Sequence, residues 1–405
     1  MKYIFLGIMI MIAAKVSSQD ALYGKVVNEI TGAPVAAASV YLSNTAVGTQ
    51  TNSQGEFFLK KPLTGNYILV ASSIGYKISE TNLQNTNLLQ GFVIKLTPET
   101  TDLKEIIVTP YEKNGWQKWG DLFLENFIGT SYYARSCKLK NHEVLKFIMR
   151  HKDSTLIVRA DEPILIVNNL LGYELRFDLK SFELNLSDSG NSLAYSGHPF
   201  FKELSAKNEK EEKKFQESRA KVYSFSMMRF MRSLFSEKAN EEFLVQQIFL
   251  GVTKDIVLGK NLQNSIITNS GVTADTIYEI GSDIVNISIV KLNNASGSEN
   301  LPYSATPEKS QTVFTLSDGL MKMYFDGALQ INIKNQNPPS EYLKYSGYNV
   351  SKNPLLSAFE LKKNVPVRIY KNGNYTESTN LKIKGFWAWW EKLATMLPLD
   401  YEPIQ

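Results

Sequence analysis

The chain has 405 residues, with 44 Lys and Arg against 40 Asp and Glu, which gives a formal net charge of +4 at pH 7. This near balance argues against nucleic acid as a partner, because phosphate backbones are bound by strongly basic surfaces. The single cysteine, Cys137, excludes a disulfide within the chain, and the length favours two or three domains.

The first residues have the pattern of an export signal. A positively charged start precedes an apolar run over residues 3–14, and Val16 and Ser18 suit a cleavage site after residue 18. This run is shorter than the ~20 apolar residues of a spanning helix. We therefore predict a signal peptide over residues 1–18 and an exported mature chain without a transmembrane segment. An uncleaved N-terminal anchor is the alternative.

Residues 20–98 contain short apolar runs separated by turn residues. The turns are Thr31–Pro34, Asn52–Gly55 and Pro62–Gly65, where glycine permits positive φ and proline fixes its own φ. Several short strands at regular spacing with Gly and Pro turns indicate a β-sandwich. The residues expected in its core are Phe57, Tyr67 and Leu69.

The same region resembles a known family. The residues that carry the resemblance are Gly24-x-Val26, Gly32-x-Pro34-Val35, Ala38-Ser-Val40, Thr51-Asn-Ser-x-Gly55-x-Phe57, Gly65-x-Tyr67 and Ile74-Gly75-Tyr76. This pattern is similar to the carboxypeptidase-regulatory-like domain of Bacteroidetes surface proteins. The resemblance implies an Ig/transthyretin-like β-sandwich of the seven-strand type over residues 19–98, followed by a linker over 99–115.

The remainder, residues 116–405, has a different pattern. Helical periodicity or composition occurs near 116–128, 208–242 and 387–397, and strand-like runs resemble an antiparallel meander. Two of these runs, 172–179 and 181–186, are predicted as separate strands. The fold class is therefore mainly β, with a larger antiparallel β-rich (α+β) domain after the sandwich. Segments such as Phe127-Ile-Gly-Thr, Ala160-Asp-Glu-Pro163 and Met396-Leu-Pro-Leu-Asp-Tyr401 are similar to an uncharacterised β-rich region of Bacteroidetes proteins. This resemblance implies architecture but no activity.

The name of the family raises the question of a zinc peptidase. A metallocarboxypeptidase binds zinc with a His-x-x-Glu pair and a distant His. None of His142, His151 and His198 begins such a motif, and nucleophile-elbow, dinucleotide, P-loop and calcium-loop motifs are absent. The sequence therefore predicts no catalytic residue, no metal and no cofactor. The three histidines are expected in surface or loop positions, and Cys137 as a small buried side chain.

Two segments offer candidate contacts for a partner or ligand. Tyr223–Ser236 is amphipathic; its apolar stripe favours a core position over a partner helix. On the other side, Arg229 and Arg232 suit a carboxylate or phosphate ligand, or internal acids. The tail holds Trp387, Trp389 and Trp390, and its helical spacing favours a closing strand and short helix packed on the second domain. Sugar stacking, an interface or a membrane surface is the alternative.

These observations predict an exported, non-enzymatic accessory or interaction protein of the bacterial envelope, in the periplasm or associated with the outer membrane. Its expected partner is another envelope protein or a cell-surface polymer. Two alternatives stay open. One is a glycan- or peptide-binding module that uses exposed aromatic side chains. The other is a cryptic hydrolase that uses carboxylates, since two acids can meet from distant parts of a chain.

Overall fold

The computed structural model describes residues 21–60, 66–83, 91–99, 110–187, 191–236, 238–249, 252–256, 277–280, 287–290, 312–317, 320–346, 355–363, 365–376 and 378–404. The predicted signal peptide lies outside these residues, as does most of the predicted linker. The described part is mainly β with a few helices, which confirms the predicted fold class. None of its helices is both long and apolar enough to cross a membrane.

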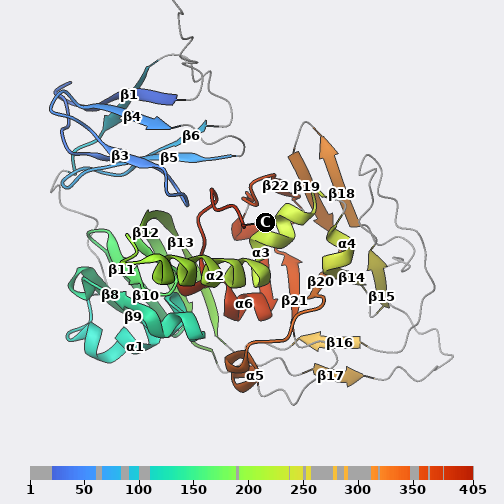
Figure 1. The fold of residues 1–405 in the computed structure, drawn as a ribbon. Coiled ribbons are helices and arrows are strands. Elements are labelled where there is room, and N and C mark those ends of the chain that lie inside the picture. The colour runs from blue at the N-terminus through green and yellow to red at the C-terminus, as the bar shows by residue number, and fades with distance from the viewer. Residues whose placement is uncertain are drawn as a thin grey trace, which may run out of the picture.

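The N-terminal region is a β-sandwich of two sheets, at the top of Figure 1. Strand β1 lies between β4, which is antiparallel to it, and β7, which is parallel. The second sheet has the order β3-β2-β5-β6. The strands are β1 (Ala21–Asn28), β2 (Ser39–Leu42), β3 (Gly48–Gln50), β4 (Glu56–Lys60), β5 (Ile68–Ser72), β6 (Ser79–Asn82) and β7 (Phe92–Leu96).

The core of the sandwich follows the alternation of its strands. Phe57, Tyr67 and Leu69 are buried, as predicted from the sequence. Gly55 has φ +75°, and a Cβ atom there would lie 2.5 Å from the carbonyl oxygen of Val26. This turn therefore needs glycine for both its backbone angle and its close approach to β1.

The larger domain begins with helix α1 (Gly115–Phe127), whose phenylalanines pack on a six-stranded sheet. Its strands are β8 (Cys137–Leu139), β9 (Leu145–Arg150), β10 (Thr155–Ala160), β11 (Ile164–Asn168), β12 (Tyr173–Asn185) and β13 (Ser192–Glu203). The two predicted strands at 172–179 and 181–186 are one long strand, β12. A register shift between Leu179 and Ser181 marks a bulge, so the break in the sequence pattern bends the strand without ending it.

The helical segment predicted at 208–242 is divided into three helices, α2 (Glu209–Phe225), α3 (Met227–Ser233) and α4 (Ala239–Glu242). The break between the first two lies at Ser226, which has extended backbone angles and accepts a hydrogen bond from the backbone N–H of Arg229 at 3.1 Å. A serine in this position caps the new helix. The apolar stripe of α3, with Met227, Phe230 and Met231, is buried as core.

The rest of the larger domain contains a five-stranded sheet with the order β15-β14-β20-β21-β23 and a three-stranded sheet with the order β18-β19-β22. A separate strand pair is formed by β16 (Ile277–Ile280) and β17 (Ile287–Val290). The other strands are β14 (Phe243–Phe249), β15 (Val252–Ile256), β18 (Thr312–Ser317), β19 (Leu320–Phe325), β20 (Ala328–Ile333), β21 (Leu356–Leu361), β22 (Val367–Tyr370) and β23 (Leu381–Gly385). Helix α5 (Ser340–Ser346) precedes β21, and α6 (Phe386–Trp390) follows β23, with a single 3₁₀ turn at Leu393–Thr395.

The sandwich lies on β12 and β13 of the larger domain (Figure 1). The sheet β3-β2-β5-β6 faces this junction, and the sheet β4-β1-β7 lies on the far side. The sandwich has its own hydrophobic core, and Leu399 of the C-terminal tail packs within it. The tail therefore joins the two domains.

Candidate functional site

The junction between the domains gathers polar and charged side chains from both of them, and we describe it as the candidate site. It begins with backbone pairing. The backbone N–H of Asn44 donates to the carbonyl of Pro199 at 2.6 Å, and that of Phe201 donates to Thr45 at 2.9 Å. The loop after β2 thus pairs with the edge of β13, in parallel orientation at Thr45 and Phe200.

The C-terminal tail covers the other side of this loop. The backbone N–H of Leu399 donates to the carbonyl of Asn44 at 2.7 Å. The N–H of Ala46 donates to a carboxylate oxygen of Asp400 at 3.0 Å. Burial raises the pKa of Asp400, and the hydrogen bond from Ala46 opposes this rise. The loop of the sandwich is therefore held on two sides by the larger domain.

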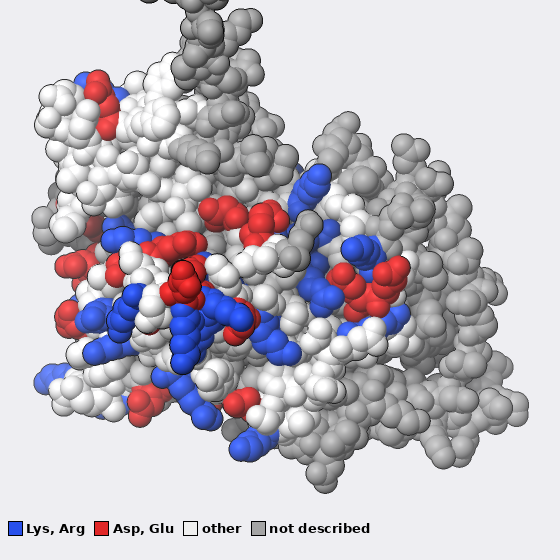
Figure 2. Space-filling model, in the orientation of Figure 1, with Lys and Arg blue, Asp and Glu red and all other residues white. Residues whose placement is uncertain are grey.

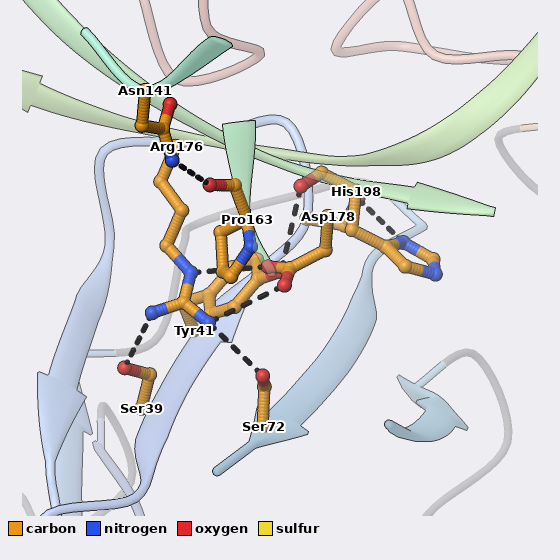
Figure 3. A network of polar contacts seen from close by, with 9 residues as sticks. Ser39, Tyr41, Ser72, Asn141, Pro163, Arg176, Asp178 and His198 are labelled. Atoms are coloured by element: carbon orange, nitrogen blue, oxygen red, sulfur yellow. Dashed lines mark hydrogen bonds and ion pairs between the residues drawn. The ribbon is translucent and has the colours of Figure 1, made fainter. Parts of the chain in front are cut away.

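A network of side chains lies beside this backbone pairing (Figure 3). Arg176 and Asp178 are two residues apart on β12, so both point to the face that meets the sandwich. The hydroxyl of Tyr41 donates to Asp178 at 2.5 Å. Burial, followed by the charge of Asp178, raises the pKa of Tyr41, so its hydroxyl remains a donor at physiological pH.

The guanidinium of Arg176 connects the two domains. Its Nε lies 3.1 Å from Asp178 Oδ2. Its two terminal nitrogens donate to the hydroxyls of Ser39 and Ser72 at 3.1 and 3.0 Å. Asp178 is only 4% exposed. The planar donors of an arginine suit this simultaneous contact with a carboxylate and two hydroxyls.

A second group lies around Glu80 of β6. One of its carboxylate oxygens lies 2.8 Å from Lys180 Nζ and 3.1 Å from His198 Nε2. The other ring nitrogen of His198 lies 3.1 Å from the hydroxyl of Ser43. Partial burial by itself would raise the pKa of Glu80, but its close contacts with Lys180 and His198 lower it overall.

These contacts make the junction a binding surface between the two domains of one chain. Tyr41 and Asp178 are buried. The guanidinium of Arg176 donates hydrogen bonds to Asp178 and to the hydroxyls of Ser39 and Ser72. Buried charges that are paired and hydrogen-bonded in this way fix the relative position of the packed elements. The chemistry of the junction is therefore that of a structural connection between the domains.

Carboxylates gather in one small cavity beside the junction. It has a volume of about 230 Å³, and its acidic lining residues are Glu203, Glu212, Asp400 and Glu402. Arg219 also lines it, with Nη1 at 3.2 Å from Glu203 and the guanidinium 4.0 Å from the centre of the Tyr173 ring. Small-molecule sites commonly have volumes of ~300–1,000 Å³. Within the described residues, this cavity brings four carboxylates together.

The two arginines singled out from the sequence are engaged within the protein. Arg229 Nε lies 2.9 Å from a carboxylate oxygen of Glu242. Arg232 donates to the carbonyls of Asn372, Leu399 and Tyr401, at distances from 2.9 to 3.0 Å. Arg232 thus holds the C-terminal tail against α3.

The three tryptophans of the tail are core residues. Trp387, Trp389 and Trp390 are 0%, 5% and 2% exposed. The indole N–H of Trp387 donates to the carbonyl of Phe225, and that of Trp389 donates to the hydroxyl of Thr130, both at 2.8 Å. The predicted packed position is therefore confirmed, and the alternative that they line an open groove for a glycan or peptide is wrong. Helix α6 turns them inwards, where they pack against phenylalanines from α2, α3 and β21.

The three histidines and Cys137 lie in different parts of the fold and differ in their exposure to solvent. His198 is 4% exposed, which corrects the expectation of a surface or loop position, whereas His151 is exposed. His142 packs beside Trp116, with ring centres 4.7 Å apart. Burial raises the pKa of the Cys137 thiol to about 12. Among the described residues, no group of three His, Cys, Asp or Glu side chains is arranged to hold a metal ion.

Sequence reasoning missed the residues of the junction. A signal was present in Leu175-Arg-Phe-Asp178, where apolar residues alternate with one residue of each charge. Leu175 and Phe177 are buried in the core, so the two charged residues share the opposite face. Opposite charges two residues apart on one strand face indicate an ion pair. The sequence does not indicate that a tyrosine and two serines of the first domain meet it.

Comparison with known proteins bears on the first domain. The family model of the CarboxypepD_reg-like domain matches residues 22–108. No curated protein matches the chain. The match covers the strands of the sandwich, β1 to β7. The N-terminal sandwich is therefore a carboxypeptidase-regulatory-like domain.

Proposed function

We propose that this chain is an exported, non-catalytic accessory protein of the bacterial cell envelope that binds another envelope component. The observation that carries the proposal is that one of the two sheets of the sandwich contacts the larger domain. This sheet is fixed to the larger domain through the junction, and the other sheet points away from it. A sandwich held in this way is a rigid support for a binding surface.

The N-terminal sequence supports the export part of this proposal, because its pattern is that of a signal peptide. The junction supports the accessory role. The charged side chains of the junction form ion pairs and hydrogen bonds with each other. We therefore expect the sandwich to position a ligand and not to catalyse a reaction on it. The periplasm and the outer-membrane surface are the two locations that we propose.

Fractionation of producing cells tests the location, and a pull-down from envelope extract tests the accessory role. We expect the mature chain in the periplasmic or outer-membrane fraction and at least one envelope component that co-purifies reproducibly. A control without its export signal is expected in the cytoplasm. Recovery of the full chain in the cytoplasm alone, or the lack of any reproducible partner, would contradict the proposal.

A carboxylate-based hydrolase is the second candidate function. It is favoured only by the convergence of Asp400 with three glutamates around the cavity beside the junction. Incubation of the purified protein with aryl glycosides and peptide amides tests it, with Glu203→Gln as the matched variant. Turnover that falls at least 100-fold in this variant would support the hydrolase and contradict the non-catalytic function.

A further inference from the structure

The outer face of the sheet β4-β1-β7 carries large apolar side chains that are exposed in the described part of the chain. Tyr23 on β1 is 46% exposed, and Phe58, its direct neighbour on β4, is 66% exposed. Val93 on β7 is 63% exposed. Soluble proteins usually keep such side chains scattered, and a contiguous group marks a contact surface. The next residues along these strands, Leu22 and Phe57, point inwards and are buried.

These side chains border a groove with a volume of about 550 Å³. That volume falls within the ~300–1,000 Å³ that is common for ligand sites. From the same sheet and its β7 end, the lining also includes Gly24, Lys25, Glu56, Phe57, Gly91 and Phe92. Asn52 contributes from the turn before β4, and Gln50 from β3 at the edge of the other sheet. The groove thus combines an aromatic centre with hydrogen-bonding groups around it.

The ring of Tyr23 is held against the sheet by a glycine. A Cβ atom on Gly91 would lie 3.2 Å from Cε2 of Tyr23 and 3.6 Å from Cδ2. The absence of a side chain at position 91 therefore leaves room for the ring to lie against the backbone. Nearly half of the tyrosine side chain remains open to solvent. A supported, half-exposed ring is a surface on which a flat ligand can stack with little loss of side-chain entropy.

The polar groups around the aromatic centre are of two kinds. Asn52 and Glu56 are joined by a hydrogen bond of 2.9 Å, and the carbonyl oxygen of the Asn52 side chain accepts backbone N–H groups of its own turn. Gln50 is exposed and Lys25 is half-buried, and both line the groove. The charged residues that line the groove are one lysine, Lys25, and one glutamate, Glu56. In the view of Figure 2, charged side chains gather over α2, whereas the sandwich is largely uncharged.

We propose that this groove binds a neutral glycan, with a sugar ring stacked on Tyr23 and Phe58 and its hydroxyls hydrogen-bonded to Gln50 and Lys25. The C–H groups on one face of a sugar ring complement the negative face of an aromatic ring. A purely apolar partner would desolvate Lys25 and Gln50 without replacing their hydrogen bonds. A highly charged polymer has no complement in a groove whose lining carries one lysine and one glutamate. The site deepens the proposed function by naming the class of its envelope partner, and it rests on that function for its biological setting.

Binding of the purified chain without residues 1–18 to an array of neutral and anionic glycans tests the site. We expect binding to neutral glycans and a loss of at least tenfold in affinity for Tyr23→Ala and for Phe58→Ala. Tyr132→Ala is the matched control, because Tyr132 is 52% exposed on the larger domain, and it is expected to bind like the unmodified protein. Unfolding midpoints of all variants are compared to establish that each is folded.

Two outcomes overturn the site. One is the absence of binding to every neutral glycan on the array. The other is unchanged binding by the two variants of the groove. Size-exclusion chromatography with light scattering tests whether the face binds a second copy of the chain instead of a glycan. If the unmodified protein is a dimer and Tyr23→Ala is a monomer, the face is a dimer interface and the glycan site is wrong. Because these measurements use pure components, their failure leaves the fractionation and pull-down results of the proposed function unaffected.

Discussion

The two faces of the sandwich follow the same strand alternation but have opposite environments. On the sheet β3-β2-β5-β6, the outward-pointing Tyr41 is 1% exposed because the larger domain covers it. On the sheet β4-β1-β7, the outward-pointing Tyr23 is 46% exposed. Both tyrosines occupy a strand position that alternation assigns to the surface of an isolated sandwich. The difference shows that docking of a second domain, and not local sequence pattern, decides which face is free.

The largest expected effect comes from removal of the carboxylate at the junction. Asp178→Ala leaves the Arg176 guanidinium and the Tyr41 hydroxyl without their shared partner. Breaking a buried charge pair in this way costs about 3 kcal/mol in the free energy of unfolding. Chemical denaturation measures it, with Lys213→Ala as a control, since Lys213 is exposed in a 3.9 Å ion pair with Glu217. A loss below about 1 kcal/mol would mean that the junction contributes little to the coupling of the domains.

A smaller effect is expected where the loop approaches β13. A Cβ atom on Gly48 would lie 2.5 Å from two atoms of the Phe200 ring and 2.9 Å from the Cβ of Tyr41. Gly48→Ala therefore displaces the Phe200 ring, which packs on Tyr41, and we expect a loss of about 1–2 kcal/mol. Gly91→Ala on the free face is the matched comparison, because only the movable ring of Tyr23 lies nearby. Thermal unfolding that ranks the two variants in the opposite order would contradict the comparison.

The Glu80 group predicts a dependence on pH. The pKa of Glu80 in the folded protein is lower than its ordinary value of 4.5, so its charged form stabilises the fold. This contribution is fully present above pH 4.5 and is lost as pH falls through the folded pKa. We expect Glu80→Gln to lose less than about 1 kcal/mol at pH 7, because the carboxylate is partly exposed. The difference from the unmodified protein should shrink in denaturation at pH 3, and an equal difference at both pH values would exclude this mechanism.

The smallest effect on stability is expected on the free face. Phe58 is 66% exposed, so Phe58→Ala should change the free energy of unfolding by no more than about 0.5 kcal/mol. Tyr41→Ala on the docked face is the direct counterpart and should cost several times more. A loss of about 2 kcal/mol for Phe58→Ala would show that this face is also covered, and it would end the contrast between the two sheets.

The sequence predicted the sandwich well because its strands are short and their turns carry residues with special backbone angles. Gly32, Gly55 and Gly75 all adopt positive φ. It predicted the long strand β12 less well, because a one-residue bulge interrupts the alternation in the same way as a turn does. The composition of residues 208–242 suggests one continuous helical segment. Ser226 divides this segment, because it caps a new helix.

The candidate contacts were harder to predict than the fold. Trp387 and Tyr23 are both aromatic residues near a strand, yet one is fully buried and the other is half exposed. Their exposure depends on which distant segments pack over them, and single-sequence periodicity carries no such information. The junction likewise brings together residues more than 100 positions apart, such as Tyr41 and Asp178.

The pairing of the 43–46 loop with β13 has a consequence for how the protein can be divided. An uncovered strand edge exposes unpaired backbone groups, which recruit strands of other molecules and promote aggregation. In the intact chain the sandwich occupies part of that edge through Asn44 and Thr45. Separation of the larger domain from the sandwich would uncover it. The first domain therefore covers backbone groups of β13 that an isolated second domain would expose. We expect a fragment of the second domain to stay monomeric only with a substitute, such as a charged residue at position 200 or 201 beside the existing Pro199.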